Sequence, residues 1–480
     1  MNYKMIRYLI GKMIRIEALL LLVPTLVSVY YREPITKTLF MICVGLTVLG
    51  SILSYEEPDK SEFYAKEGLV IVATTWLVLS LCGALPFYLT GEIPSYIDSF
   101  FETVSGFTTT GSTILTDIEV MSKGLLFWRS FTHWIGGMGV LVFAFAIFSQ
   151  SSVNSMYIMK AEVPGHKVGK LVSKISLTAR ILYGIYILLT VIEVGFLYAG
   201  GMSFFDCWIH AFSTAGTGGF SSHNASIAYF DSVYIESVIT IFMILFGINF
   251  QLYYFLLLKK FKECFGSEEL RYYLLIILGA IILISFNIRT VAGSWGEAVR
   301  GSSFQVAAII TTTGFVTRDY QQWPFLSQGI LLTLMYIGAM SGSTGGGIKV
   351  SRIILMIKNT VMGIRKIQHP NRVFSIQIEN SPVPQGVMQE LQAYFNLYLC
   401  IMVISLLVLL SQGMDLLSTF GAVSCCLNNV GPGLGVVGPV DNFSSLTNIS
   451  KLILSFDMLA GRLELFPMVI IFLPTTWRKN

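Results

Sequence analysis

The chain has 480 residues, of which 54% are hydrophobic and only 12% are charged, and its mean hydropathy is +0.68. Apolar residues in this proportion exceed what a water-soluble core can bury, so the composition predicts an integral membrane protein. The net charge of +4 is small, and no basic stretch alternates with aromatic residues, which argues against a nucleic-acid partner.

Ten segments are apolar and long enough to cross a bilayer, for which about 20 residues are needed. The first run, 14–31, has no small-residue cleavage site and leads directly into a second span, so it is interpreted as a retained helix rather than a signal peptide. In chain order the predicted spans are 12–31, 36–54, 68–89, 125–149, 179–200, 232–258, 272–291, 325–357, 391–412 and 449–474.

Four shorter apolar segments lie between these spans, at 97–108, 203–215, 298–311 and 415–428. Each is about half a span, and a segment that enters and leaves the membrane must bury its irregular backbone in protein or beside water. The sequence therefore predicts an all-α membrane protein with four modules, each made of a helix, a pore helix, a loop and a second helix. Two extra helices are expected in 1–66, and the modules in 67–150, 151–260, 261–389 and 390–480.

Each half-span ends in a loop that contains a glycine, and these glycines recur at intervals of 108, 95 and 117 residues. This regularity indicates a fourfold internal repeat. Four loops of threonine, glycine and asparagine around one axis can present a ring of backbone carbonyl oxygens that replaces the water of a cation. The candidate ion-binding residues are Thr109, Thr110, Gly111, Thr217, Gly218, Gly219, Thr312, Thr313, Gly314, Asn429, Val430 and Gly431.

The repeats also agree in the pore helices. Asp98 and Asp206 both stand 13 residues before their loop glycines, where a carboxylate is expected to cap free amides, whereas the third and fourth modules have Gly301 and Ser418 there. A small residue stands six positions before each glycine and is expected to allow close packing of the pore helix. These small residues are Ser105, Ser213, Ala308 and Cys425.

The distribution of charge predicts the orientation. Of the 32 Lys and Arg residues, 23 lie at the two termini and in 55–67, 150–180, 259–271 and 349–390, which the positive-inside rule places in the cytoplasm. Both termini are then cytoplasmic, and the loops open to the outside. Acidic residues of the opposite face either attract cations to a vestibule or belong to ordinary solvated loops. They include Glu92, Asp98, Glu102, Asp117, Glu119, Asp206, Asp231, Glu236, Glu297, Asp319 and Asp441.

Residues 338–347 contain five glycines in ten positions, and each glycine disfavours a helix by about 1 kcal/mol relative to alanine. The eighth span is therefore expected to break there. A phosphate-binding loop is the alternative, but Ile348 separates Gly347 from Lys349, where a Walker A motif needs lysine directly after its last glycine.

Arg462 lies about 13 residues into the last span, near the middle of the bilayer. A charge at that depth requires water or a partner, so Arg462 either faces a pore or pairs with Glu464 or Asp457. Of the remaining polar groups, His210 either faces the vestibule or is a hydrogen-bonded structural residue. The seven cysteines form no CxxC pair and are interpreted as small packing residues.

The loops 109–112, 217–220, 312–315 and 428–435, together with the run 133–139 (HWIGGMG), resemble the TrkH branch of the Trk/Ktr/HKT potassium transporter superfamily. The resemblance covers essentially the whole chain. It implies potassium uptake as a homodimer among the lipids of the bacterial inner membrane, with K⁺ as the transported ion and no organic cofactor on this chain. It also implies regulation by a cytoplasmic RCK-type nucleotide-binding subunit similar to TrkA.

The same resemblance implies roles for individual residues. Gly111, Gly219, Gly314 and Gly431 would be the selectivity-filter glycines, and glycine rather than serine at position 111 favours potassium over sodium. Arg462 would form a barrier below the filter. A gating loop would comprise Gly342, Ser343, Thr344, Gly345, Gly346, Gly347 and Lys349.

Two other functions are alternatives to a passive pore. A proton- or sodium-coupled potassium symporter would keep the same fold and would need ionisable groups in the membrane, for which Glu17, Glu193 and Arg462 are the main candidates. A membrane enzyme would need clustered nucleophile, base or metal residues on one surface, and the sequence shows no such cluster.

Overall fold

The computed structural model describes residues 2–58, 65–139, 175–372, 374–378 and 381–477. Helices make up nearly all of the regular structure, and the small sheet in these ranges pairs β1 (Gln377–Ile378) with β2 (Ser381–Pro382) in antiparallel fashion. In this part of the chain six helices are long and apolar enough to cross a membrane, or seven if one bent pair is counted as a span. The all-α membrane fold predicted from the sequence is confirmed.

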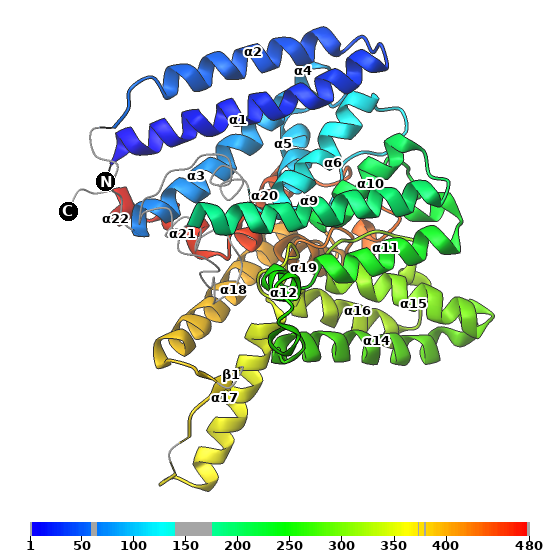
Figure 1. Ribbon diagram of the computed structural model, residues 1–480, viewed down its shortest axis with the longest axis vertical. Helices are drawn as coiled ribbons and strands as arrows, with labels where there is room; N and C mark the ends of the chain where they lie inside the picture. The colour runs from blue at the N-terminus through cyan, green and yellow to red at the C-terminus, as the bar shows by residue number, and fades with distance from the viewer. Residues whose placement is uncertain (1, 59–64, 140–174, 373, 379–380, 478–480) are drawn as a thin grey trace.

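Two antiparallel helices, α1 (Tyr3–Tyr30) and α2 (Thr36–Leu53), lie along one edge of the molecule (Figure 1). They approach closely because both lack a side chain at the crossing: a Cβ on Gly50 would lie 2.7 Å from the carbonyl oxygen of Gly11. Large apolar residues such as Leu19 and Phe40 are exposed on their outer surface, at 63% and 57%. This exposure is typical of a surface in contact with lipid.

The remaining helices are grouped by predicted module, and the module ranges stay a prediction; α13, which begins at the predicted boundary of 261, is given with the helices before it. The first contains α3 (Ala65–Gly83), α4 (Leu85–Leu89), the pore helix α5 (Tyr96–Phe107) and α6 (Lys123–Gly137). The second contains α9 (Ile175–Ala199), the pore helix α10 (Phe204–Gly216), η1 (Ser226–Phe230), α11 (Val233–Phe246), α12 (Phe250–Leu257) and α13 (Phe261–Phe265).

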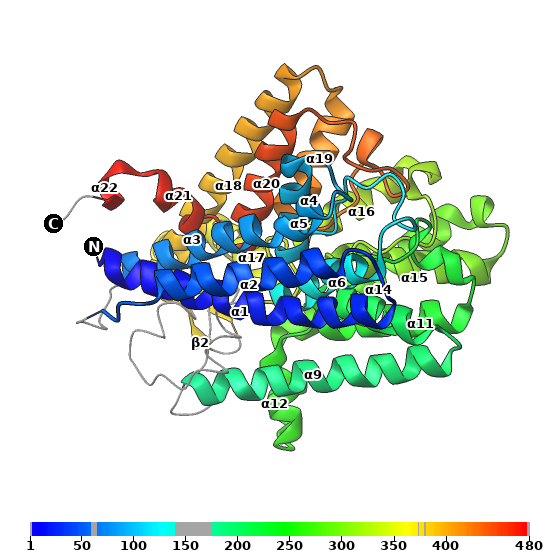
Figure 2. The same cartoon turned by 90° about the horizontal axis from the view of Figure 1, so that it is seen from above.

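The third contains α14 (Glu268–Ala292), the pore helix α15 (Trp295–Ile310), η2 (Tyr320–Gln322), α16 (Phe325–Ile337) and α17 (Val350–Gln368). The fourth contains α18 (Gln385–Ser411), the pore helix α19 (Leu416–Asn428), η3 (Gly435–Val437), α20 (Asn448–Arg462), α21 (Phe466–Phe472) and α22 (Pro474–Trp477). Seen from above, α18 and α20 lie on one side and α9 and α12 on the other (Figure 2).

The pore helices of the first two modules are capped by serines rather than by the expected aspartates. The side chains of Ser95 and Ser203 accept the backbone N–H groups of Asp98 and Asp206, at 3.3 and 3.1 Å. The two aspartates stand in the first helical turn, where they still favour the helix dipole. The expectation that they are the caps is therefore wrong, because the hydroxyl three residues earlier reaches the free amides first.

The other two pore helices also pair a hydroxyl with an acid three residues away. Ser294 accepts the N–H of Glu297 at 3.2 Å, and Asp415 accepts the N–H of Ser418 at 3.0 Å. In the third module the pair stands four residues further from the loop glycine, because α15 is longer than the other pore helices. In the fourth it stands at the same two positions as in the first, but the acid is the cap and the hydroxyl follows it.

The second long helix of every module stops on the same side of the loops, at Gly137, Phe246, Ile337 and Arg462. The predicted break in 325–357 is confirmed, because α16 and α17 are separated by residues 338–349. The predicted spans 232–258 and 449–474, however, are not single helices. The first bends by 92° between α11 and α12, and the second breaks at 463–465, where Glu464 and Leu465 have positive φ. Residues 140–149 of the fourth predicted span lie outside the described residues.

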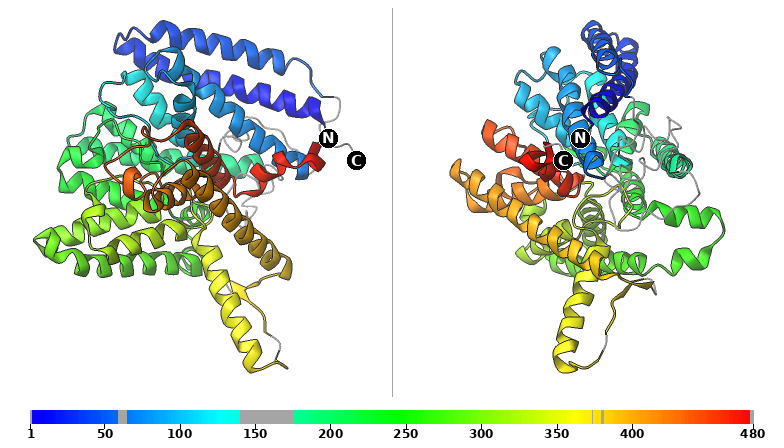
Figure 3. Two further views of the ribbon diagram at one scale, coloured as in Figure 1. Left: turned by 180° about the vertical axis from the view of Figure 1, so that it is seen from behind. Right: turned by 90° about the vertical axis from the view of Figure 1, so that its left-hand side faces the viewer.

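Helix α17 extends away from the body of the molecule as an arm (Figures 1 and 3). The two ends of the described chain meet elsewhere, where the ring of Tyr3 stacks on Trp477 with centroids 6.4 Å apart. The Tyr3 hydroxyl also donates to the carbonyl of Trp477 at 2.8 Å. Both ends of the chain therefore lie on the same side of the molecule.

Candidate functional site: a ring of four loops

The four predicted loops, 109–111, 217–219, 312–314 and 429–431, share one backbone conformation, and together they are called the loop ring below. The glycine of each has positive φ, and so has the residue two positions before it. Non-glycine residues rarely adopt positive φ, so its recurrence at four equivalent positions reflects a common fold of the loops. The φ values of these earlier residues are 54° for Thr109, 56° for Thr217, 60° for Thr312 and 56° for Asn429.

The surroundings of the glycines show how the loops are arranged. A Cβ on Gly111 would overlap the carbonyl oxygen of Gly218 in the second loop, and one on Gly219 would overlap that of Thr313 in the third. The same relation continues from the third loop to the fourth, between Gly314 and Val430. A Cβ on Gly431 would lie 2.7 Å from the carbonyl oxygen of Thr110, which closes the cycle. The structure therefore brings all twelve candidate residues together around one axis.

Hydrogen bonds tie the fourth loop to its neighbours. Asn429 donates from Nδ2 to Thr110 Oγ1 at 3.0 Å, and Ser112 donates to the carbonyl of Gly431 at 3.1 Å. On the other side, the Tyr320 hydroxyl donates to the carbonyl of Gly433 at 3.0 Å. These bonds tie the fourth loop to the first loop on one side and to the third module on the other.

Residues 338–349, called the glycine loop below, pack directly against the ring. The N–H of Gly346 donates to Thr312 Oγ1 at 2.6 Å, and the N–H of Gly347 donates to the carbonyl of Asn428 at 3.0 Å. Lys349 is buried and donates from Nζ to the carbonyl of Gly345 within the same loop. The glycine loop therefore lies against the third and fourth loops, at the ends of their pore helices.

Arg462 connects this glycine loop to the first module. It is 5% exposed and donates to the carbonyl of Thr344 at 2.7 Å and to those of Gly136 and Gly137 at 2.6 Å. Glu464, one of the two partners considered from the sequence, forms an ion pair with Arg352 at 2.5 Å. Arg462 is therefore held between backbone carbonyls of the glycine loop and of the C-terminal end of α6.

Known proteins share this architecture. The sequence model of the TrkH family, described as a cation transport protein, matches residues 36–479. The chain is 36% identical to the Trk system potassium uptake protein TrkH of Escherichia coli K12, with 100% of both chains covered. It is 32% identical to the Trk system potassium uptake protein TrkG of the same strain, covering 100% of this chain and 99% of the relative.

A solved structure agrees. The crystal structure of the potassium transporter TrkH from Vibrio parahaemolyticus matches with a TM-score of 0.89 and 32% identity, over 100% of both chains. The chain belongs to the TrkH family of cation transport proteins. This membership confirms the resemblance noted in the sequence, and it assigns the chain to membrane transport rather than to enzyme catalysis.

One buried ion pair of this TrkH family member was not predicted. Arg129 and Glu102 are 2% and 1% exposed, and their Nε and Oε1 atoms are 2.6 Å apart. Glu102 also accepts the Ile114 N–H at 3.0 Å, and Arg129 donates to the carbonyl of Ser221 at 3.0 Å. The pair therefore joins a pore helix to the segments that follow the first and second loops. In the sequence, the signal for this ion pair is the single arginine inside the predicted span 125–149.

The acidic residues of the predicted outer face have different environments. Four of them are in ion pairs with Lys or Arg: Glu102 with Arg129, Glu236 with Arg300 at 2.6 Å, Asp98 with Lys451 at 2.6 Å, and Glu297 with Arg318 at 3.5 Å. Glu102 and Glu236 are buried, so the interpretation of these two as vestibule or solvated acids is wrong. Asp117, Glu119 and Asp441 remain exposed.

The remaining polar predictions of the TrkH chain can also be placed. His210 is buried, and its ring nitrogens bond to the Asp206 carbonyl at 2.8 Å and to Ser221 Oγ at 2.9 Å, so the structural interpretation is confirmed. All seven cysteines are free, and only Cys400 is exposed. Within the described ranges, no group of three or more His, Cys, Asp or Glu side chains is placed to hold a metal ion.

Proposed function

We propose that this chain takes up potassium ions across the bacterial inner membrane by passive permeation through the loop ring. The observation that carries the proposal is the closed cycle in which each loop glycine faces a carbonyl of the next loop. Carbonyl oxygens on four sides can replace the hydration shell of a potassium ion. Glycine at position 111 and the names of the Escherichia coli relatives, which are potassium uptake proteins, favour potassium as the cargo.

The alternative is a proton- or sodium-coupled symporter on the same fold. Its candidate carboxyl groups, Glu17 and Glu193, are buried at 3% and 0% exposure. Glu17 Oε1 would lie 2.8 Å from a Cβ on Gly83, where side chains of the pore helix α5 also approach, and Glu193 interacts with Thr214 of the pore helix α10. Both carboxyl groups therefore pack behind pore helices and not among the twelve loop residues, which favours the passive pore, because a coupling group acts most directly where it meets the transported ion.

We further propose that the glycine loop and Arg462 together control flux. The sequence suggested two separate barriers, one steric and one electrostatic. The hydrogen bond from Arg462 to Thr344 joins them, so that moving the glycine loop also breaks a contact of the arginine. A positive charge below a cation filter opposes the passage of cations, and its release with the loop would remove both barriers in one step.

The α17 arm is the proposed docking surface for a cytoplasmic nucleotide-binding subunit similar to TrkA. Of the basic residues in 349–390, Lys349 and Arg352 are buried and Lys358 pairs with Glu268 at 2.6 Å. Arg365, Lys366 and Arg372 are exposed near the far end of the arm. Because α17 begins directly after the glycine loop, a partner that moves the arm pulls on that loop. The protein is proposed to act as a homodimer with both termini in the cytoplasm.

Flux into liposomes tests the transport mechanism. Purified protein should let potassium run down its own gradient at a rate that an imposed proton or sodium gradient leaves unchanged. Empty liposomes are the control. Potassium accumulation that requires one of those gradients would replace the passive pore with the symporter.

A further inference from the structure

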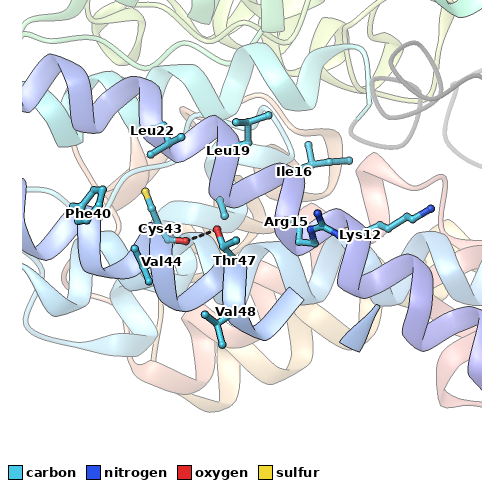
Figure 4. Close-up of a pocket in the computed structure, with 11 residues that line it drawn as sticks. Lys12, Arg15, Ile16, Leu19, Leu22, Phe40, Cys43, Val44, Thr47 and Val48 are labelled. Atoms are coloured by element: carbon cyan, nitrogen blue, oxygen red, sulfur yellow. Dashed lines mark hydrogen bonds between the residues drawn. The ribbon is translucent and has the colours of Figure 1, made fainter. Parts of the chain in front are cut away.

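An apolar groove runs between α1 and α2 on the membrane-facing side of the hairpin. It consists of two adjoining cavities of about 510 and 630 Å³, which share Leu22 and Phe40 in their lining. Figure 4 shows the first cavity, which is lined by Leu19 and Leu22 on α1 and by Val44 on α2. The small side chains of Ala18 and Cys43 also line this cavity and leave space there.

One end of the groove carries two cations, Lys12 and Arg15, which lie one and two helical turns beyond Tyr8 (Figure 4). Nearer the end of the helix, Arg7 and Tyr8 bond to Glu56 and Glu57 at 2.5 and 2.8 Å. Neither Lys12 nor Arg15 forms a salt bridge within the described part of the chain, although Lys12 Nζ lies 4.3 Å from the centre of the Tyr8 ring. Lys12 and Arg15 therefore lie further from the N-terminal end of α1 than the Arg7–Glu56 ion pair, beside the apolar side chains of the groove.

The groove is longer than one leaflet of a bilayer. From Lys12 to Val29 the axis of α1 rises by about 26 Å, at ~1.5 Å per residue, and Lys37 lines the far end. One leaflet is about half of the ~30 Å hydrocarbon core of a membrane, so a single lipid covers the part of the groove nearest Lys12 and Arg15. A charge that close to hydrocarbon is unfavourable without an anionic partner, and the partner available at that depth is the phosphate of a lipid in the same leaflet.

We propose that the α1–α2 groove binds one anionic phospholipid, with its phosphate between Lys12 and Arg15 and an acyl chain along Leu19, Leu22 and Phe40. The two cations select an acidic headgroup, and the apolar walls select a chain. A second protein copy would have to bring both an acidic group and a long apolar segment to the same groove, whereas one lipid molecule supplies both. The inference is independent of the proposed transport mechanism.

Native mass spectrometry of the full-length protein tests this site. The protein in detergent is mixed with equal amounts of phosphatidylglycerol and phosphatidylcholine that have identical acyl chains. We expect one phosphatidylglycerol per protomer to be retained, in preference to phosphatidylcholine. The double variant Lys12→Gln/Arg15→Gln should retain about tenfold less phosphatidylglycerol. The matched control Lys259→Gln/Lys262→Gln removes two exposed cations that line neither cavity, and should retain the lipid as the wild type does.

A second variant tests the acyl chain. Val44→Trp fills the groove but leaves both cations in place, so phosphatidylglycerol should again be lost. Glycerol phosphate, which has the headgroup but no chain, should not bind at the same concentration. Equal retention of phosphatidylglycerol by Lys12→Gln/Arg15→Gln and its control would overturn the proposal. So would glycerol phosphate binding as well as the lipid, or loss of a dimer in the double variant, which would make the groove a protein interface.

Discussion

The four modules are alike in the loop ring but differ in the layer of helix ends next to it. In the ring, four loops with three different sequences adopt one backbone conformation, and each loop meets the next through the same glycine-to-carbonyl relation. Below it, the modules diverge: α11 bends sharply into α12, residues 338–349 form a long loop, and α20 ends in Arg462. Under the proposed function, the symmetric ring would surround an ion with equivalent oxygens, and the asymmetric layer would supply the one segment that moves.

The largest expected effect is a loss of protein stability when the buried Glu102–Arg129 ion pair is broken. Glu102→Gln leaves the Arg129 guanidinium buried without its counter-charge, which should destabilise the protein by about 3–5 kcal/mol. Thermal unfolding in detergent measures this. The control Glu297→Gln breaks a partly exposed pair with Arg318, and should change stability by at most about 1 kcal/mol. Equal melting temperatures for the two variants would show that the buried pair does not hold the ring.

Gly111→Ser tests the ring itself. A side chain at position 111 is forced into a positive φ, which costs about 1–2 kcal/mol, and its Cβ overlaps the Gly218 carbonyl. The carbonyl must move, so the potassium-to-sodium permeability ratio should fall by about tenfold, equivalent to ~1.4 kcal/mol. The control Gly329→Ser has open space around its Cβ and should keep the wild-type ratio. An unchanged ratio in Gly111→Ser would remove the first loop from the ion path.

A smaller effect is expected from Arg462, which belongs to the asymmetric layer. Arg462→Ala removes both the charge and the bond to Thr344, so potassium flux should rise about three- to tenfold, given ~1.5 kcal/mol for a charged hydrogen bond. Arg462→Lys keeps the charge but cannot donate to three carbonyls in the same geometry. If flux rises in both variants, the hydrogen bonds of Arg462 close the path. If flux rises only in Arg462→Ala, the positive charge closes it. An alanine variant that conducts less than wild type would contradict both.

The smallest effect is expected at the arm. Arg365→Gln/Lys366→Gln removes two exposed charges from the proposed docking surface, and should weaken binding of the regulatory subunit about two- to fivefold at low salt. Surface plasmon resonance can measure this. Lys259→Gln/Lys260→Gln, with the same loss of charge between α12 and α13, is the control. Equal weakening by both pairs would mean that only net charge matters.

The sequence predicted the ring because its signals are local. A glycine preceded by threonine or asparagine at the end of each short apolar segment is visible without any contact, and so is the cluster of glycines in 338–347. The breaks at 247–249 and 463–465 were missed, because single polar residues such as Asn249 and Glu464 do not end an apolar segment when hydropathy is averaged over a whole span. In the first, Asn249 restarts the helix by accepting the N–H of Gln251 at 2.9 Å. The pairing of Glu102 with Arg129 joins residues 27 positions apart and depends on tertiary packing, so no local sequence pattern predicts it.

The most direct test of the account is to locate the ion. Crystals grown in thallium, a potassium substitute with strong anomalous scattering, should show an anomalous peak on the axis of the loop ring. The peak should lie among the carbonyl oxygens of Thr110, Gly218, Thr313 and Val430, and it should weaken in Gly111→Ser. Thallium bound elsewhere in the protein, with an empty ring, would contradict the claim that these four loops form the ion site.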